Sequence, residues 1–318
     1  MGALLKRVLP WVGSVGLVAY LVATTDLGAV WQAVRTVPLV PLVAAAVVGV
    51  VATWLWDVLC LTLLLRRFNA PVGYGELLPL KGASYFLNIL NYNAAAGGMA
   101  LYLRRVRGVP FLEGASSFLF LNGADAAVLA ILVVVGLLGA GDAVGADART
   151  GLWTTAGVLL AGLVGTWIYW NARFDFFVLG RLRSWRIFHA FRRARLADYG
   201  WLTGLRLVFV LLDILLMWVF LRLFGVAIPL PAMLALHPIV ILLWTLPVSI
   251  AGLGTVQVAM RLLYAPFADP GIVDPVPVID ACSTTMIFTT VLARVLIGYA
   301  SLRRVSHEWA AAGAEPTR

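Results

Sequence analysis

Charged residues are scarce in this sequence. Asp, Glu, Lys and Arg make up 12% of its 318 residues, whereas 62% of the residues are hydrophobic. A water-soluble domain carries about 25% charged residues, so this chain has too few polar side chains to cover a soluble globule. The composition excludes a soluble enzyme or binding domain of this length. It predicts an integral membrane protein in which residues 1–318 form a single membrane domain.

Residues that bind metals or form disulfides are also scarce. The two cysteines lie in apolar runs and the three histidines are scattered, so we predict no disulfide framework and no metal site. The short motifs of serine hydrolases, zinc proteases and phosphate-binding loops are missing as well. We therefore predict no catalytic residue, no cofactor and no enzymatic activity. The alternative is an intramembrane dyad in which His237 acts with Ser84 or Ser249.

Lysine is nearly absent, because 22 of the 24 basic residues are arginines. The net charge of +9 would suggest a nucleic-acid partner in a soluble protein. In a membrane protein it reflects the retention of basic residues in cytoplasmic loops. The distribution, which begins with Lys6 and Arg7, predicts a multi-pass protein of the cell membrane with both termini in the cytoplasm. The predicted partners are membrane lipids with anionic headgroups and no nucleic acid, and a homo-oligomer is left open.

Long apolar runs are what the sequence does contain. A membrane-spanning helix needs about 20 apolar residues. Six runs of this kind lie at 8–24, 39–65, 114–139, 152–170, 203–224 and 278–301. We interpret the first as a retained span, since no clear signal-peptidase site follows it. The stretch 173–200 is basic with interleaved aromatic residues, which predicts a cytoplasmic segment with a helix on the membrane surface.

Two further apolar segments, 82–103 and 231–263, are interrupted by small and polar residues. The interrupting residues are Asn88, Asn91, Asn93, Gly97 and Gly98 in the first segment, and Ser249, Gly252 and Gly254 in the second. Lys81 precedes the first segment and Arg104 follows it, so a simple crossing would leave one basic cluster outside. We predict two re-entrant helical hairpins, buried in protein or lining a wet cavity. Two ordinary spans interrupted by Gly and Pro are the alternative.

The two interrupted segments are related by a constant offset along the chain. The matched residues are Asp57 with Asp213, Lys81 with His237, and Gly98 with Gly254. The predicted fold is an all-α polytopic membrane protein with six full spans and two re-entrant helical hairpins. They form an inverted repeat, the first copy at about 38–140 and the second at about 201–302. Inverted repeats whose broken helices meet near mid-membrane are typical of transporters.

Ionisable residues within spans cost energy and are candidates for function. The deep ones are Asp57, Asp125, Asp213 and Arg294. We predict that they bind substrate together with the interrupting Asn, Gly and Ser residues. Arg294 suits a phosphate because its planar guanidinium can donate two hydrogen bonds at once. Structural pairing of the aspartates with neighbouring helices is the alternative.

The residues around the interruptions also carry a family resemblance. The runs 86–110 and 246–254 resemble the lysylphosphatidylglycerol synthase/flippase transmembrane region. The resemblance implies flipping of a lipid or polyprenyl-phosphate-type amphiphile between leaflets, with its headgroup in a cavity between the repeats. The chain departs from the family at Met99 and at Gln257, where an acidic residue is usual, and we keep Gln257 among the predicted substrate-binding residues. The alternative function is a non-catalytic membrane scaffold or accessory subunit of a cell-envelope enzyme.

Overall fold

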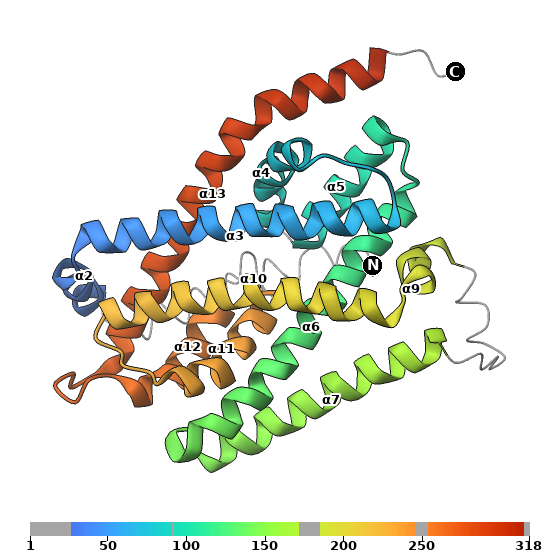
Figure 1. Cartoon of the computed structure of the whole chain (residues 1–318). Helices are drawn as coiled ribbons and strands as arrows, with labels where there is room; N and C mark the ends of the chain where they lie inside the picture. The colour runs from blue at the N-terminus through green and yellow to red at the C-terminus, as the bar shows by residue number, and fades with distance from the viewer. Residues whose placement is uncertain (1–26, 91, 172–184, 246–253, 315–318) are drawn as a thin grey trace, which may run out of the picture.

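The computed structural model describes residues 27–90, 92–171, 185–245 and 254–314, and these residues are helical apart from short connections (Figure 1). A helix satisfies the hydrogen bonds of its own backbone, which a bilayer core cannot do. Within these ranges, extended pairing is limited to one isolated bridge between Val226 and Ala268. The prediction of an all-α protein is confirmed.

The helices follow one another with few residues between them. In chain order they are α2 (Leu27–Thr36), α3 (Leu39–Phe68), α4 (Tyr74–Leu90), α5 (Tyr92–Arg107), α6 (Phe111–Ala140), α7 (Ala146–Asn171), α9 (His189–Arg193), α10 (Leu196–Leu223), α11 (Leu230–Thr245), α12 (Thr255–Tyr264) and α13 (Pro275–Ala314). Short 3-10 turns lie at Gly141–Ala143, Arg186–Phe188 and Ala265–Phe267.

Five of these helices, α3, α6, α7, α10 and α13, are long and apolar enough to cross a membrane. They coincide with five of the six predicted spans, and the remaining run, 8–24, lies outside the described residues. The shortest, α7, has 26 residues. Such a helix is about 39 Å long and exceeds the hydrocarbon thickness of about 30 Å. Large apolar side chains on these helices are exposed, as Val40 (80%) and Leu138 (74%) show, which is expected of a surface that faces lipid.

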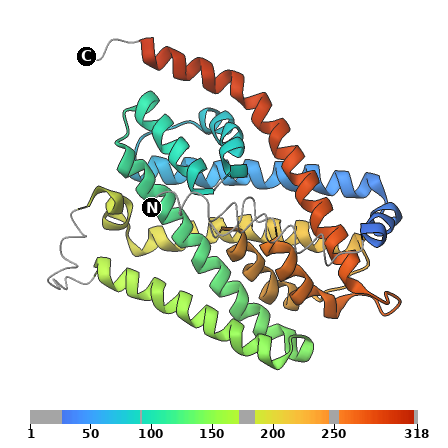
Figure 2. The same cartoon turned by 180° about the vertical axis from the view of Figure 1, so that it is seen from behind.

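Each interrupted segment folds as a pair of helices rather than as one. The pair α4–α5 lies on one side of the neighbouring helices α3 and α10, and the pair α11–α12 lies on the other (Figures 1 and 2). Figure 2 shows the same order from behind. With 17, 16, 16 and 10 residues, the four helices are each shorter than the roughly 20 residues that a span requires.

The helix pairs pack across the molecule onto long helices from the other half of the chain. The most extensive contacts are those of α11 with α6 and of α4 with α13. Glycine permits both. A Cβ atom at Gly136 of α6 would overlap the backbone of Ala235 in α11, and a Cβ atom at Gly82 of α4 would overlap the side chain of Ser301 in α13. Residues far apart in the sequence are thereby brought around one centre.

The basic segment is only partly described, so the predicted surface helix stays a prediction for most of its length. Residues 172–184 lie outside the described part, and the rest begins with a 3-10 turn and the five-residue helix α9. Phe191 of α9 is 9% exposed, and its ring lies edge-on to Phe120 of α6 with the centroids 5.1 Å apart. The hydroxyl of Ser116 accepts a hydrogen bond from the amide of Ala190 at 2.9 Å. Phe191 therefore packs into the protein because α6 offers it an apolar surface, whereas Trp185 is exposed.

The last helix is longer than the predicted span 278–301, since α13 continues to Ala314. Its final turns pack on α5. The Tyr102 hydroxyl is hydrogen-bonded to Glu308, and the Arg105 guanidinium lies 4.4 Å from the ring centroid of Trp309. These polar and cation–π contacts stabilise the part of the helix that extends beyond its apolar residues.

Candidate functional site

A cavity of about 370 Å³ lies between α3, α4, α6, α10, α11 and α13. The charged and polar residues that line it are Thr53, Asp57, Lys81, Tyr85, Asn88, Asn122, Asp125, Arg206, Asp213, His237, Trp244, Thr245, Thr290 and Arg294. Aliphatic side chains from the same helices, among them Leu129, Val210, Met217, Val240 and Met286, supply much of its apolar wall. The cavity thus offers charged and apolar surface to one occupant.

A buried ion network occupies the side of the cavity formed by α3, α6 and α10. Arg206 is 2% exposed and donates to both oxygens of Asp125, from Nε at 2.5 Å and from Nη2 at 2.9 Å. Its Nη1 donates to Asp57 Oδ1 at 2.5 Å. The Nζ atom of Lys81 lies 2.6 Å from the other oxygen of Asp57. Two cations and two anions therefore neutralise one another, which buried charges require.

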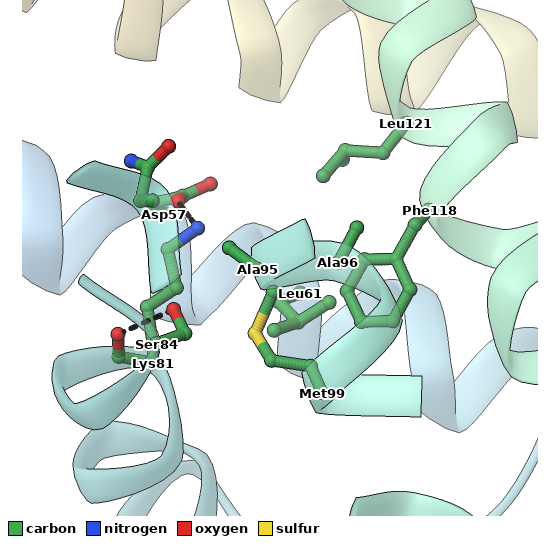
Figure 3. A pocket seen from close by; sticks show the side chains of 10 residues that line it. Asp57, Leu61, Lys81, Ser84, Ala95, Ala96, Met99, Phe118 and Leu121 are labelled. Atoms are coloured by element: carbon green, nitrogen blue, oxygen red, sulfur yellow. Dashed lines mark hydrogen bonds and ion pairs between the residues drawn. The ribbon is translucent and has the colours of Figure 1, made fainter. Parts of the chain in front are cut away.

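Lys81 lies at a different place from the one predicted for it. The sequence prediction treated it as a loop charge that flanks the first hairpin. Figure 3 shows its side chain reaching from α4 to Asp57, and the side chain is 11% exposed. A buried ion pair is no marker of the cytoplasmic side, so Lys81 does not support the re-entrant topology. Arg104, at the end of α5, is exposed.

Sequence reasoning named neither Lys81 nor Arg206 as a binding residue. Arg206 was expected to lie within a span, but it is near the start of the apolar run 203–224, where a charge at the end of a span is ordinary. Its role follows from the two carboxylates that other helices bring to it. Asp57 and Asp125, which were predicted as substrate-binding residues, both take Arg206 as a partner.

A second, looser cluster lies at the wall of the cavity that α10 and α11 form, and Tyr264 of α12 takes part in it. His237 of α11 is 3% exposed, and its Nδ1 is hydrogen-bonded to the Tyr264 hydroxyl at 2.7 Å. Its Nε2 lies 3.5 Å from Oδ2 of Asp213, whose side chain is 37% exposed. Asp213 is therefore held less tightly than Asp57, although the two residues occupy matched positions of the repeat.

Arg294 of α13 lines the same cavity with all three aspartates. Its guanidinium lies 5.8 Å from the ring centroid of Tyr85. Among the described residues, no carboxylate lies within ion-pair distance of it, whereas Lys81 and Arg206 are both paired. Arg294 is therefore the lining cation whose charge is not neutralised by a neighbour in the described part of the chain.

A small pocket of about 10 Å³ adjoins the network beneath α5 (Figure 3). It shares Asp57, Lys81 and Asn88 with the large cavity. Met99 lines it together with Lys81. A space of this size is at the limit for one water molecule.

Four of the predicted binding residues do not line the cavity. Gly97 and Gly98 lie within α5, and a Cβ atom at Gly98 would come 2.5 Å from Leu87. Gly254 has φ +91°, and its amide donates to Oε1 of Gln257 at 2.7 Å. Gln257 is 5% exposed and caps the start of α12. Close packing accounts for Gly98, and helix capping accounts for Gly254 and Gln257, whereas Gly97 has open space around it.

The remaining predicted residues are only partly described. Asn88 lines the cavity, and Asn93 lies in the first turn of α5. Asn91, Ser249 and Gly252 lie outside the described residues. Of the alternative dyad, the Ser84 hydroxyl donates to the carbonyl of Lys81 at 2.7 Å, whereas His237 is hydrogen-bonded to Tyr264, so the described part does not bring Ser84 and His237 together.

Comparison with known proteins identifies one family. Residues 7–293 match the family model described as the lysylphosphatidylglycerol synthase TM region. No curated protein and no solved structure matches the chain. The match covers most of the sequence, including α3, α4, α6, α10 and α11, and it ends within α13, one residue before Arg294. This multi-pass membrane protein therefore belongs to the lysylphosphatidylglycerol synthase transmembrane-region family.

Proposed function

We propose that the chain flips a lipid or polyprenyl-phosphate-type amphiphile between leaflets, with the headgroup in the charged cavity. The observation that carries the proposal is Arg294. It lines the cavity without an ion-pair partner among the described residues, while the other lining cations are paired. A phosphate would give this guanidinium the bidentate acceptor it lacks.

The size and composition of the cavity support a headgroup as the occupant. Its volume of about 370 Å³ lies in the range of small-molecule sites, about 300 to 1,000 Å³. Its aliphatic wall can pack against the part of an acyl or prenyl chain that lies next to the headgroup. We include the membrane location, cytoplasmic termini, anionic lipid partners and non-enzymatic action in the proposal. A homo-oligomer remains compatible with it.

We include the inverted repeat with re-entrant hairpins in the proposal, and two further observations support the relation between its two halves. The base on the first helix of each pair lies beside an aspartate on the preceding long helix, Lys81 with Asp57 and His237 with Asp213. Each pair also packs on the closing long helix of the other half, α4 on α13 and α11 on α6. This exchange of partners suits two related halves that move around a shared site.

The test is translocation of fluorescent phosphatidylglycerol in liposomes that contain the purified protein. Wild type should expose the label to an external quencher faster than empty liposomes do. Arg294→Gln should lose most of this rate, and Arg294→Lys should lose nearly as much, because lysine cannot donate as a planar fork. Arg303→Gln is the matched control, since Arg303 is an exposed residue of the same helix.

The outcomes separate the candidate functions. A folded wild type that moves no labelled phosphatidylglycerol, dolichyl phosphate or undecaprenyl phosphate favours the scaffold or accessory subunit. Translocation that survives Arg294→Gln supports a flippase but removes Arg294 from the binding site. Folding of each variant is checked by size-exclusion chromatography in detergent.

A further inference from the structure

His237 is a buried histidine, and one of its ring nitrogens has no hydrogen-bond partner in the described part of the chain. It lies on α11 in the wall of the cavity and is 3% exposed. Nδ1 is hydrogen-bonded to the Tyr264 hydroxyl, but Nε2 makes no hydrogen bond within the described part of the protein. This nitrogen lies 3.5 Å from Oδ2 of Asp213. A buried polar atom without a hydrogen bond is uncommon in folded proteins and calls for an explanation.

The first half of the repeat suggests what is missing between His237 and Asp213. At the position that matches His237, Lys81 presents a permanent positive charge to Asp57 at 2.6 Å. Histidine, in contrast, gains and loses its charge between about pH 5 and about pH 8. An imidazolium at position 237 would give Asp213 the cationic partner that Asp57 already has.

We propose that His237 and Asp213 form a proton-binding site, and that lipid movement through the cavity is coupled to proton binding there. The proposal rests on the proposed function and adds the ion that accompanies the lipid. The proton comes from water in the cavity and is held on the imidazole, whose two nitrogens then both carry hydrogen. Nδ1 donates to the Tyr264 oxygen and Nε2 to Asp213 Oδ2. Release returns the proton to cavity water.

The charges of the cavity give the coupling its direction. With neutral His237, its three aspartates balance Lys81, Arg206 and Arg294, so the formal charge of the lining is zero. Protonation of His237 makes the lining positive by one unit. An anionic headgroup is then bound more tightly, and by linkage the headgroup strengthens proton binding to the same degree.

Other ionisable groups around His237 do not change charge in this pH range in the same way. Besides Asp213, α10 contributes Arg206, which stays charged and holds Asp125 of α6. α12 contributes Tyr264, and α13 contributes Cys282 near Tyr264 as well as Arg294. Phenol and thiol groups ordinarily lose their protons above pH 8. Among these kinds of side chain, an imidazole is the one whose charge ordinarily changes between about pH 5 and about pH 8.

The experiment measures translocation of fluorescent phosphatidylglycerol in liposomes between about pH 5 and about pH 8. The wild-type rate should change by at least about fivefold, the lower end of typical coupling between sites. His237→Gln, which is always neutral, should flatten this dependence. His237→Lys, which copies Lys81 and is always positively charged, should also flatten the dependence, with the rate held at the level that the charged histidine gives. His307→Gln is the control, because His307 is exposed near the end of α13 and should keep the wild-type profile.

Failure of the inference differs from failure of the proposed function. A wild type that moves lipid equally fast over the whole range, or a His237→Gln variant that keeps the wild-type profile, overturns the coupling and leaves the flippase intact. A wild type that moves no lipid at any pH overturns both. If His237→Gln does not fold, nitrogen NMR of the three labelled histidines in wild type decides. A buried histidine whose titration shifts when phosphatidylglycerol is added supports the site, and one that keeps its charge state over the range overturns it.

Discussion

The two sides of the cavity carry an aspartate and a base at matched positions but neutralise them to different extents. On the first side, Asp57 accepts from Lys81 and Arg206 and is 6% exposed. On the second, His237 at 3.5 Å is the base beside Asp213 in the described part of the chain, and the Asp213 side chain is 37% exposed. The first cluster is closed by permanent charges, whereas the second stays open to water and to a ligand.

This difference divides the work between the two halves. Buried charges that are paired on all sides hold helices in register, and they resist a change of partner because breaking such a pair is costly. A half-exposed carboxylate beside a histidine can change partners at little cost. We therefore expect the first half to govern stability and the second half, with Arg294, to govern transport.

The largest effect should come from Asp57→Asn compared with Asp213→Asn. Asp57→Asn leaves Lys81 and one arm of Arg206 without a carboxylate, which should lower the free energy of unfolding by about 3 to 5 kcal/mol. Asp213→Asn should cost less than about 1 kcal/mol, as for an exposed pair. Thermal unfolding of both variants in detergent is the measurement.

A charge-balanced variant provides the control for this comparison. Asp57→Asn combined with Lys81→Met removes one charge of each sign and should recover part of the lost stability. Equal losses for Asp57→Asn and Asp213→Asn would contradict the division into a closed and an open half.

An intermediate effect is expected where the helix pairs touch the long helices. Gly136→Ala places a methyl group against the backbone of Ala235 and should cost about 1 to 3 kcal/mol by overpacking. Gly82→Ala meets the side chain of Ser301, which can rotate, so its cost should be smaller. Gly123→Ala, also in α6 with open space around it, should be neutral or stabilising, since alanine favours helices. Thermal unfolding ranks the stability losses of the three variants. A larger loss for Gly82→Ala than for Gly136→Ala would contradict the expectation that the backbone of Ala235 yields less than the side chain of Ser301.

The smallest effect should follow Ser84→Ala in the small pocket that adjoins the cavity. The Ser84 hydroxyl donates to the carbonyl of Lys81 within its own helix (Figure 3), so its loss should cost less than about 1 kcal/mol. The rate of lipid translocation should stay within about twofold of wild type, which corresponds to less than about 0.5 kcal/mol. A nucleophilic serine would instead lower activity by several orders of magnitude. Such a loss in the folded variant would favour the intramembrane enzyme.

The elements of this fold were largely predictable, and the details of the site were not. The apolar runs located α3, α6, α7, α10 and α13, because lipid selects for length and hydropathy residue by residue. The interruptions at Asn88–Gly98 and before Gly254 marked the breaks in the two helix pairs. The surface helix expected over 173–195 stays a prediction for the residues outside the described part, whereas Phe191 packs on α6, because an aromatic side chain packs equally well on lipid headgroups and on a helix.

The sequence by itself determined that this chain is helical, lies in the membrane and carries charges at depth. Only the tertiary structure decided which charges meet. Arg206 takes carboxylates 149 and 81 residues away, Lys81 turns inward to Asp57, and Arg294 is left beside Tyr85. Hydropathy acts locally along the chain and can be read from it. Neutralisation of a buried charge depends on distances of a few ångströms between helices that are remote in sequence, and those distances are fixed only when the helices pack.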